Sequence, residues 1–199
     1  MTTLEAIEKL NTYDIILASK SPRRQYLMKE LGLKFRVVND LYMEEIYPSV
    51  LKAEEIPVYI ARAKAACYDK IIEQDTLLIT ADTIVWLENV VIGKPVDLED
   101  AVVMLQKLSG NMHEVFTGVC IKSALNEIVF HASSKVFFRK FSEEEIHYYV
   151  NKYKPLDKAG AYGVQEWIGY AGVERIEGSY FNVMGMPIQR LYCELLKFI

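Results

Sequence analysis

A buried strand that runs directly into a capped helix is the feature of this sequence that most constrains its fold. Tyr13–Ala18 is an apolar run, which predicts a strand. Ser21 suits a helix N-cap, and Pro22 suits the first helical position, where an amide N–H would lack a partner. The helix is expected to reach about Leu31, because Gly32 suits the residue that follows a helix end. A strand joined so closely to a helix is typical of α/β proteins.

Patterns for strands and helices alternate along the rest of the chain. Further helices are expected near residues 1–12, 54–72, 97–108, 142–151 and 187–198. Strands are expected at residues 34–38, 77–80, 84–87, 90–92, 113–122 and 128–138, and the strand over 77–80 is expected to end at Ala81-Asp82. The glycine-rich stretch 153–178 predicts loop with short strands. With antiparallel pairs in the middle and no linker or repeat, the sequence predicts an α/β fold with a mixed sheet.

Composition excludes several classes of protein. With 199 residues, 51% of them hydrophobic, the chain can bury the core of one large domain or two small lobes. A net charge of −4 argues against general nucleic-acid binding, and no apolar run approaches the length of a membrane span. The cysteines, at positions 67, 120 and 193, fit a reducing compartment with buried, inert thiols, and the three histidines lack zinc spacing. The chain shows no signal peptide, so a soluble cytoplasmic protein is expected.

Two adjacent arginines, Arg23 and Arg24, stand in the first turn of the helix that begins after Ser21. Free amides at a helix N-terminus attract anions, and cations are disfavoured there unless an anion lies between. The pair therefore predicts either an anion site or two solvated surface arginines. Minor-groove DNA binding by the Ser-Pro-Arg-Arg segment is a third interpretation, which the acidic chain and the single copy of the segment disfavour.

Four other positions could carry chemistry, and each also has an ordinary structural explanation. Asp82 closes an apolar run, either as a turn residue or as a catalytic carboxylate at the carboxyl edge of the sheet. Lys94 lies on a Gly-Lys-Pro turn that lacks the glycine spacing of a P-loop. Lys64 lies on a helix among alanines, and both lysines could simply be solvated. Gln165 could hydrogen-bond the edge of a nucleobase or be an ordinary loop residue.

Taken in order, these segments resemble the Maf family of nucleoside triphosphate pyrophosphatases. The resemblance covers residues 13–192. It rests on Ser-x-Ser-Pro-Arg-Arg after a strand, Lys64, Ala-Asp-Thr, Gly-Lys-Pro, Leu-Ser-Gly-x-x-His, Asp-Lys-Ala-Gly-x-Tyr and Gly-Ser-Tyr. It implies one Maf-like domain over residues 1–199, with a mixed, twisted sheet, flanking helices and two lobes around a central cleft, as in inosine triphosphate pyrophosphatases.

The resemblance also implies a reaction and its residues. Family members hydrolyse nucleoside triphosphates to the monophosphate and pyrophosphate with a divalent metal, Mg²⁺ or Mn²⁺, and are commonly homodimers. Asp82 matches the catalytic carboxylate, and Glu45 with Asp82 would hold the metal. The matching substrate-binding residues are Ser19, Arg23, Arg24, Lys64 and Lys94. A triphosphate carries about four negative charges, which four such cations can offset. Water must attack the α-phosphorus, and Asp82 can take its proton or hold the metal that acidifies it.

The resemblance extends to one branch of the family, similar to dTTP/UTP pyrophosphatases. Arg23, Thr83 and Gln165 match its specificity positions, and Gly-Ser-Tyr follows downstream. A second branch, similar to 7-methyl-GTP pyrophosphatases, has glutamate where this chain has glutamine. Two residues depart from the common pattern. Glu44 replaces an aspartate, and Glu166 replaces a glycine, which adds charge and bulk beside Gln165.

Two other functions are compatible with the same residues. One is a nucleotide-binding regulator with little turnover, since the family takes its name from an association with septum formation and cell division arrest. The presence of Asp82 with four cations favours the enzyme over this regulator. The other is an enzyme that removes modified pyrimidine triphosphates and so keeps non-standard nucleotides out of nucleic acids.

Overall fold

The computed structural model describes residues 2–40 and 43–199. Within these ranges the strands form a seven-stranded sheet in the order β2-β1-β3-β5-β6-β7, with β4 paired to β3. The strands are β1 (Asp14–Ala18), β2 (Arg36–Val38), β3 (Thr76–Leu87), β4 (Val90–Ile92), β5 (Met112–Lys122), β6 (Glu127–Phe138) and β7 (Val173–Gly178). The strand pairs β1·β2 and β1·β3 are parallel, and β3·β4 and β6·β7 are antiparallel. The predicted mixed sheet is therefore confirmed.

Helices flank this sheet, as the sequence predicts. The α-helices are α1 (Thr3–Leu10), α2 (Pro22–Glu30), α3 (Glu55–Ala66), α4 (Leu98–Leu108), α5 (Glu143–Tyr153), α6 (Trp167–Gly172), α7 (Tyr180–Val183) and α8 (Ile188–Leu195). Short 3-10 turns cover Asp69–Ile71, Ala159–Ala161 and Leu196–Phe198. Among the described residues, no helix is both long and apolar enough to cross a membrane.

The chain divides into two compact units. Unit 1 consists of residues 1–82, 117–132 and 185–199, and unit 2 of residues 83–116 and 133–184. Unit 1 contains β1, β2, the helices α1, α2, α3 and α8, and parts of β3, β5 and β6. Unit 2 contains β4, β7, the helices α4 to α7, and the remaining parts of the three long strands.

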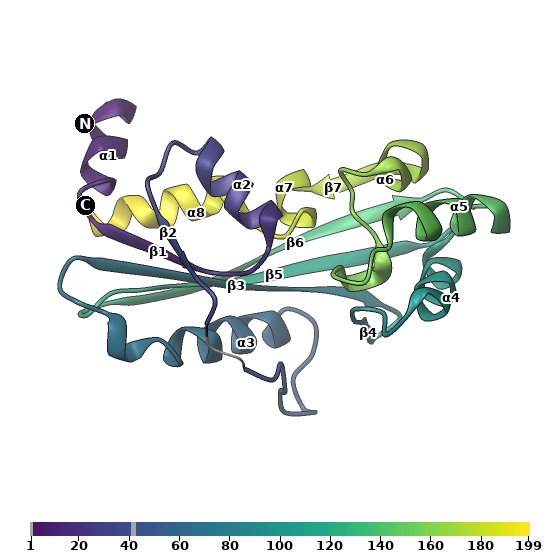
Figure 1. The fold of residues 1–199 in the computed structure, drawn as a ribbon, viewed down its shortest axis with the longest axis horizontal. Helices are drawn as coiled ribbons and strands as arrows, with labels where there is room; N and C mark the ends of the chain where they lie inside the picture. Colours follow the sequence, from purple (N-terminus) through teal and green to yellow (C-terminus); the bar gives the residue numbers. More distant parts are fainter. Residues whose placement is uncertain (1, 41–42) are drawn as a thin grey trace. The chain divides into compact units, whose positions relative to one another are not determined.

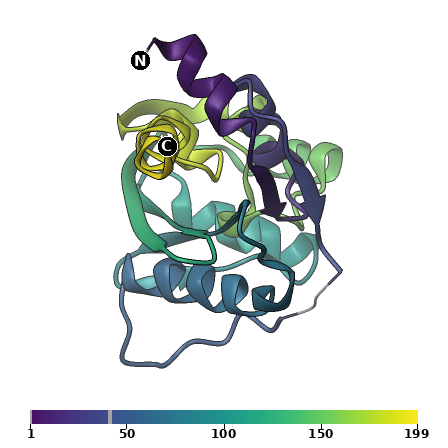
Figure 2. The same ribbon diagram turned by 90° about the vertical axis from the view of Figure 1, so that its left-hand side faces the viewer.

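In unit 1, α3 covers one face of the strands and α8 covers the other (Figures 1 and 2). Side chains two residues apart on a strand share a face, so Leu78 and Thr80 both face α3. Leu78 packs in a buried cluster with Ala61 and Ala65 of the helix. The Thr80 hydroxyl donates a hydrogen bond of 2.6 Å to the Ala61 carbonyl. The small alanines let the helix backbone approach the sheet closely.

Gly118 on β5 lies directly against the backbone of α3 in unit 1. A Cβ atom at this position would lie 2.3 Å from the carbonyl carbon and oxygen of Pro57 on α3. Real Cβ atoms do not approach backbone so closely, so α3 would have to move away from the sheet if any side chain stood here. Gly118 therefore fixes the distance between α3 and the sheet.

An aromatic cluster fills part of unit 2. The rings of His113, Phe138 and Tyr162 meet edge to face, with centroids 5.0 to 5.4 Å apart. His113 Nε2 lies 2.8 Å from the Tyr162 hydroxyl oxygen. Burial lowers the pKa of His113 to about 3, so this imidazole is neutral at physiological pH. Its place is in the core, in keeping with the absence of zinc spacing.

Three predicted segments differ from the structure. The helix expected over residues 54–72 ends at Ala66, and a separate 3-10 turn follows at Asp69–Ile71. The strand expected to end at Ala81-Asp82 continues to Leu87, because its β-branched and aromatic residues go on to pair with β4. The stretch 153–178, expected as loop with short strands, also contains α6.

The cysteines differ from expectation as well. Cys120 on β5 is buried, as predicted, but Cys67 and Cys193 are exposed. Cys67 follows the last residue of α3, and Cys193 lies on α8 next to Glu194, so neither thiol is enclosed by the sheet. The prediction of uniformly buried thiols was therefore wrong.

Gly118→Ala should destabilise the protein by at least about 2 kcal/mol, because the new methyl group displaces α3. Urea denaturation followed by circular dichroism measures this change. Gly93→Ala is the matched control, since a Cβ at Gly93 meets nothing within 4 Å. Its stability should stay within about 0.5 kcal/mol of wild type. Equal stabilities of the two variants would show that α3 does not rest directly on β5.

Candidate functional site

The carboxyl end of β1 brings several of the predicted residues together. The last β1·β3 pair joins Leu17 to Ile79, and β1 ends one residue later. β3 continues past this point, so Asp82 lies three residues beyond the last pair. Asp82 is therefore inside a long strand, not at its end as predicted, yet it lies beyond the carboxyl end of the neighbouring parallel strand. Open α/β sheets bind their ligands at such ends.

The segment that joins β1 to α2 begins with Ser19, which is buried. Its hydroxyl accepts a hydrogen bond of 3.2 Å from the Ser21 amide. The Ser21 hydroxyl in turn accepts one of 3.4 Å from the Arg24 amide, which confirms the predicted N-cap. The positive φ of Gly32, +80°, confirms the predicted end of the helix. These bonds fix the first turn of α2 and the two arginines that it carries.

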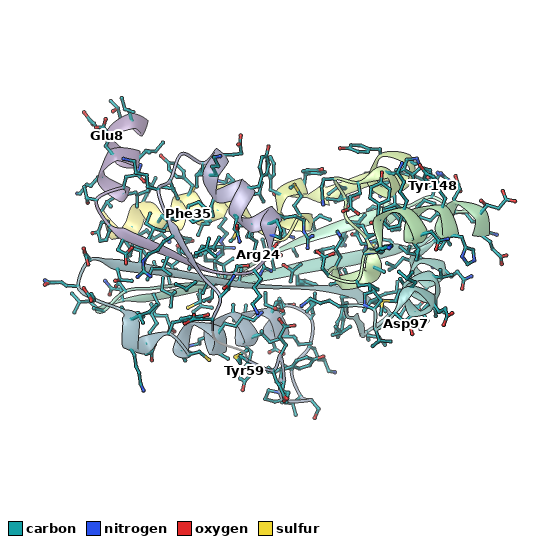
Figure 3. The ribbon with its side chains drawn as sticks, in the orientation of Figure 1. Glu8, Arg24, Phe35, Tyr59, Asp97 and Tyr148 are labelled. Carbon is teal, nitrogen blue, oxygen red and sulfur yellow. The ribbon has the colours of Figure 1, made fainter. Side chains whose placement is uncertain are left out.

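Arg24 reaches from α2 toward β3 (Figure 3). Its Nη1 donates to the Ala81 carbonyl at 2.8 Å, and its Nε donates to the Gly185 carbonyl at 2.8 Å. Burial lowers the pKa of this guanidinium, and the nearby Asp82 carboxylate opposes that effect. Arg24 is therefore held in a fixed orientation beside Asp82 and is not a solvated surface residue. Arg23 lies in the same turn, half-buried, and its charge also lowers the pKa of Arg24.

Lys64 joins two carboxylates in unit 1. It lies on α3 three residues after Ala61, so it shares the helix face that covers the sheet. Its Nζ donates to Asp82 Oδ1 at 2.7 Å and to Glu45 Oε1 at 2.7 Å. Asp82 follows Thr80 on the same strand face, which places its carboxylate toward the helix. Lys64, Glu45 and Asp82, three residues that the sequence selects separately, thus meet at one point.

Burial dominates the electrostatics of Asp82, which is 6% exposed. Burial raises the pKa of this carboxyl above its usual value, the Lys64 ammonium opposes the rise, and Glu45 adds to it. Lys64 occupies Oδ1, and no hydrogen bond from another described residue reaches Oδ2. The site therefore presents one carboxylate oxygen held by a cation and a second one that a water molecule or a metal could use.

The residues of unit 1 fit a divalent cation in one respect. Oxygens of Glu45 and Asp82 both lie 2.7 Å from the same Lys64 nitrogen, so they converge. Mg²⁺ typically binds to one or two carboxylates together with substrate phosphates and water. The described residues contain no group of three or more His, Cys, Asp or Glu side chains arranged around a single point. Two carboxylates suit a metal that shares its coordination with a phosphate.

Three predicted residues belong to unit 2. Thr83 follows Asp82 on β3, where successive side chains point to opposite faces. Lys94 lies in the exposed turn after β4, and the neighbouring Gly93 carbonyl accepts a hydrogen bond of 2.9 Å from the Gly160 amide. This hydrogen bond joins the Gly-Lys-Pro turn to the Asp-Lys-Ala-Gly segment. Neither motif alone predicts this contact.

Gln165 lies in a tight turn between the Ala159–Ala161 segment and α6. The Glu166 amide donates to the Gly163 carbonyl at 2.9 Å and closes this turn. The Gln165 Oε1 atom is buried and has no hydrogen-bond partner in the part of the chain that the structure describes. Since buried polar atoms are almost always bonded, an acceptor of this kind suits a donor on a ligand.

Sequence reasoning missed Tyr149 on α5. This residue is completely buried, and its hydroxyl contacts both Gly163 and Glu166. Burial, together with the hydrogen bond to Glu166, raises its pKa, so the phenol stays protonated. Nothing in the sequence separates this tyrosine from other aromatic residues of an amphipathic helix. The one sequence signal near its contacts is Glu166, the residue that replaces a glycine of the common family pattern.

Comparison with known proteins gives close relatives over nearly the whole chain. The family model described as Maf-like protein matches residues 14–198. A dTTP/UTP pyrophosphatase from Phocaeicola vulgatus is 56% identical over 191 residues, 96% of this chain and 99% of that protein. Its counterpart from Porphyromonas gingivalis is 46% identical over 194 residues, 96% and 98% of the two chains. Among solved structures, a HAM1 protein from Coxiella burnetii is 13% identical, with a TM-score of 0.49 over 93% of this chain and 99% of that one.

Asp82→Asn should raise the free energy of unfolding at pH 7, although it removes half of an ion pair. Burial raises the pKa of the Asp82 carboxyl in the folded protein above 3.8, the ordinary value for an aspartate. Ionisation of Asp82 therefore lowers the free energy of unfolding as the pH rises above that ordinary value. The stabilisation by Asn should therefore shrink as the pH is lowered toward 4. Urea denaturation with EDTA present measures both values.

Asp14→Asn is the control of opposite sign. A hydrogen bond from Arg36 lowers the pKa of the partly exposed Asp14, so this variant should lose up to about 1 kcal/mol at pH 7. This destabilisation should disappear as the pH falls below the pKa that Asp14 has in the folded protein. A clear destabilisation of Asp82→Asn at pH 7 would show that pairing with Lys64 outweighs the burial of the charge.

Proposed function

This chain is a member of the Maf-like family, and from that membership we propose that it hydrolyses nucleoside triphosphates, with dTTP and UTP as substrates, to the monophosphate and pyrophosphate. The observation that carries the proposal is the match of nearly the whole chain, at 46–56% identity, to proteins named dTTP/UTP pyrophosphatase. A regulator with little turnover is not favoured, because these relatives carry the name of an enzyme.

The charges of unit 1 support this reaction. Arg24 is oriented by two backbone carbonyls, and Lys64 by two carboxylates, so neither cation has to reorganise when a polyphosphate binds. Fixed cations stabilise the negative charge that moves to the leaving pyrophosphate. Arg23 and Lys94 add positive charge in this proposal, and the buried Ser19 supports the turn that carries the arginines.

Asp82 acts on the attacking water. The carboxylate oxygen that Lys64 leaves without a hydrogen bond accepts a proton as water attacks the α-phosphorus. The oxygen of that water ends in the monophosphate, and the bond between the α-phosphorus and the bridging oxygen breaks to release pyrophosphate. A divalent metal, Mg²⁺ or Mn²⁺, held by Glu45 and Asp82, would supply further charge neutralisation and lower the pKa of bound water.

Base selection falls to Gln165, with Thr83 and Arg23 as further specificity residues. An amide both donates and accepts hydrogen bonds, which suits the mixed edge of uracil or thymine. The buried Gln165 Oε1 has no hydrogen-bond partner within residues 2–40 and 43–199, which supports this assignment. A homodimer, which the resemblance implies, and a cytoplasmic location, which the sequence analysis predicts, remain predictions.

Asp82→Asn should lower kcat for pyrophosphate release from dTTP and UTP at least about a hundredfold, the usual scale for loss of a general base. Lys64→Ala should cost about 2–4 kcal/mol in kcat/KM, because it removes a fixed cation and leaves Asp82 buried without its partner. Release is measured with Mg²⁺ or Mn²⁺ over natural and modified triphosphates. Asp14→Asn and Lys122→Ala, outside the site, should keep wild-type rates. Near wild-type turnover of Asp82→Asn would remove it from the catalytic role.

Gln165→Glu should lower kcat/KM for UTP and dTTP and raise the relative rate on 7-methyl-GTP. A carboxylate accepts but does not donate, so it leaves the acceptor groups of uracil unpaired and suits the donor-rich edge of a methylated guanine. The measurement compares UTP, dTTP, CTP, GTP and 7-methyl-GTP on both proteins. An unaltered ratio of these rates would exclude Gln165 from base selection and leave the pyrophosphatase activity untouched.

A further inference from the structure

Glu166, which replaces a glycine of the common family pattern, is part of a hydrogen-bond network within unit 2. The Tyr149 hydroxyl has a single proton, which it donates to Glu166 Oε2. Its oxygen accepts a hydrogen bond of 3.0 Å from the Gly163 amide. Tyr149 cannot shift easily, because it is completely buried and its ring stacks on that of Tyr153, with centroids 5.0 Å apart. One buried phenol therefore holds both ends of the turn 163–166.

The second oxygen of the Glu166 carboxylate is also occupied. Oε1 lies 3.2 Å from the Nζ of Lys158, an almost completely buried lysine that also contacts Asp157 at 2.7 Å. Lys158 therefore compensates the charge of Glu166. The charge that Glu166 adds beside Gln165 would repel an acceptor-rich base edge, and the neighbouring Lys158 ammonium weakens that repulsion.

The Gln165 amide lies beside this carboxylate. A Cβ added to Gly163 would be 2.8 Å from Glu166 Cδ and 2.9 Å from Gln165 Nε2, so both groups pack over the same glycine. The Gln165 amide nitrogen thus lies against Gly163, and its Oε1 is buried without a partner among the described residues. A buried acceptor held in this way calls for a donor from a ligand.

We propose that Tyr149 and Glu166 are positioning residues for base selection, which hold the Gln165 amide so that its oxygen accepts the N3–H of uracil or thymine. This inference rests on the proposed function, since it assumes that Gln165 contacts the base. Cytosine has an unprotonated N3 and an amino group at position 4. The ratio of kcat/KM for UTP to that for CTP therefore measures how well the amide is placed.

Tyr149→Phe tests the proposal, because it removes only the hydroxyl that joins Gly163 to Glu166. The ratio of UTP to CTP should fall about tenfold, mainly through a higher KM for UTP. Tyr153→Phe is the matched control: it removes a hydroxyl four residues along the same helix, keeps the stacked ring, and should leave the ratio unchanged. In a Gln165→Ala background, Tyr149→Phe should change the ratio no further, because its effect passes through Gln165.

A second pair of variants guards against misfolding of Tyr149→Phe. Glu166→Gln keeps an acceptor for the phenol and should hold the ratio within about threefold of wild type, whereas Glu166→Ala should lose about tenfold. A ratio in Tyr149→Phe and Glu166→Ala within twofold of wild type would overturn the proposal, and so would an equal loss in the Gln165→Ala background. A wild-type enzyme without preference for UTP over CTP would instead overturn the base assignment on which the proposal rests. Pyrophosphate release by that enzyme would still stand.

Discussion

The hydrogen bond from Lys64 to Asp82 is the interaction on which the candidate site depends. A carboxylate as buried as Asp82 is costly unless a cation lies beside it, and the cation must come from an element packed directly on the strand. Helix α3 meets that condition because Ala61 is small and Gly118 has no side chain. Residues with no proposed part in the chemistry thus determine whether the carboxyl of Asp82, the proposed catalytic group, can be ionised at this position.

A second cation of the candidate site, Arg24, is also fixed by its surroundings. Arg24 is oriented by the carbonyls of Ala81 and Gly185, so its position follows from the backbone of β3 and of the segment before α8. Catalysis of phosphoryl transfer relies mostly on charges fixed before the substrate arrives. A guanidinium bound to two carbonyls and an ammonium bound to two carboxylates are charges of that kind. The contacts of Arg24 explain why this arginine stands in the first turn of a helix, where an isolated helix would disfavour a cation.

Local signals in the sequence predict much of this fold. The Ser21 cap and the two-residue turn before β4 can be predicted because the information lies within a few residues. The end of the strand at Asp82 was predicted wrongly, because pairing with β4 decides where β3 stops. For the site, the residue types and the family resemblance selected Asp82, Lys64 and Arg24, but not their partners. Gly185 lies 161 positions from Arg24, and Tyr149 resembles any core aromatic residue, so only the tertiary structure identifies their contacts.

The position of water attack is the central claim of the mechanism, and isotope labelling tests it most directly. Hydrolysis of UTP in ¹⁸O-water, followed by mass spectrometry of both products, reports which phosphorus the water attacks. If the water that Asp82 deprotonates attacks the α-phosphorus, one ¹⁸O atom appears in UMP and none in pyrophosphate. Label in pyrophosphate would place the attack at the β-phosphorus and contradict the proposed roles of Asp82 and Lys64.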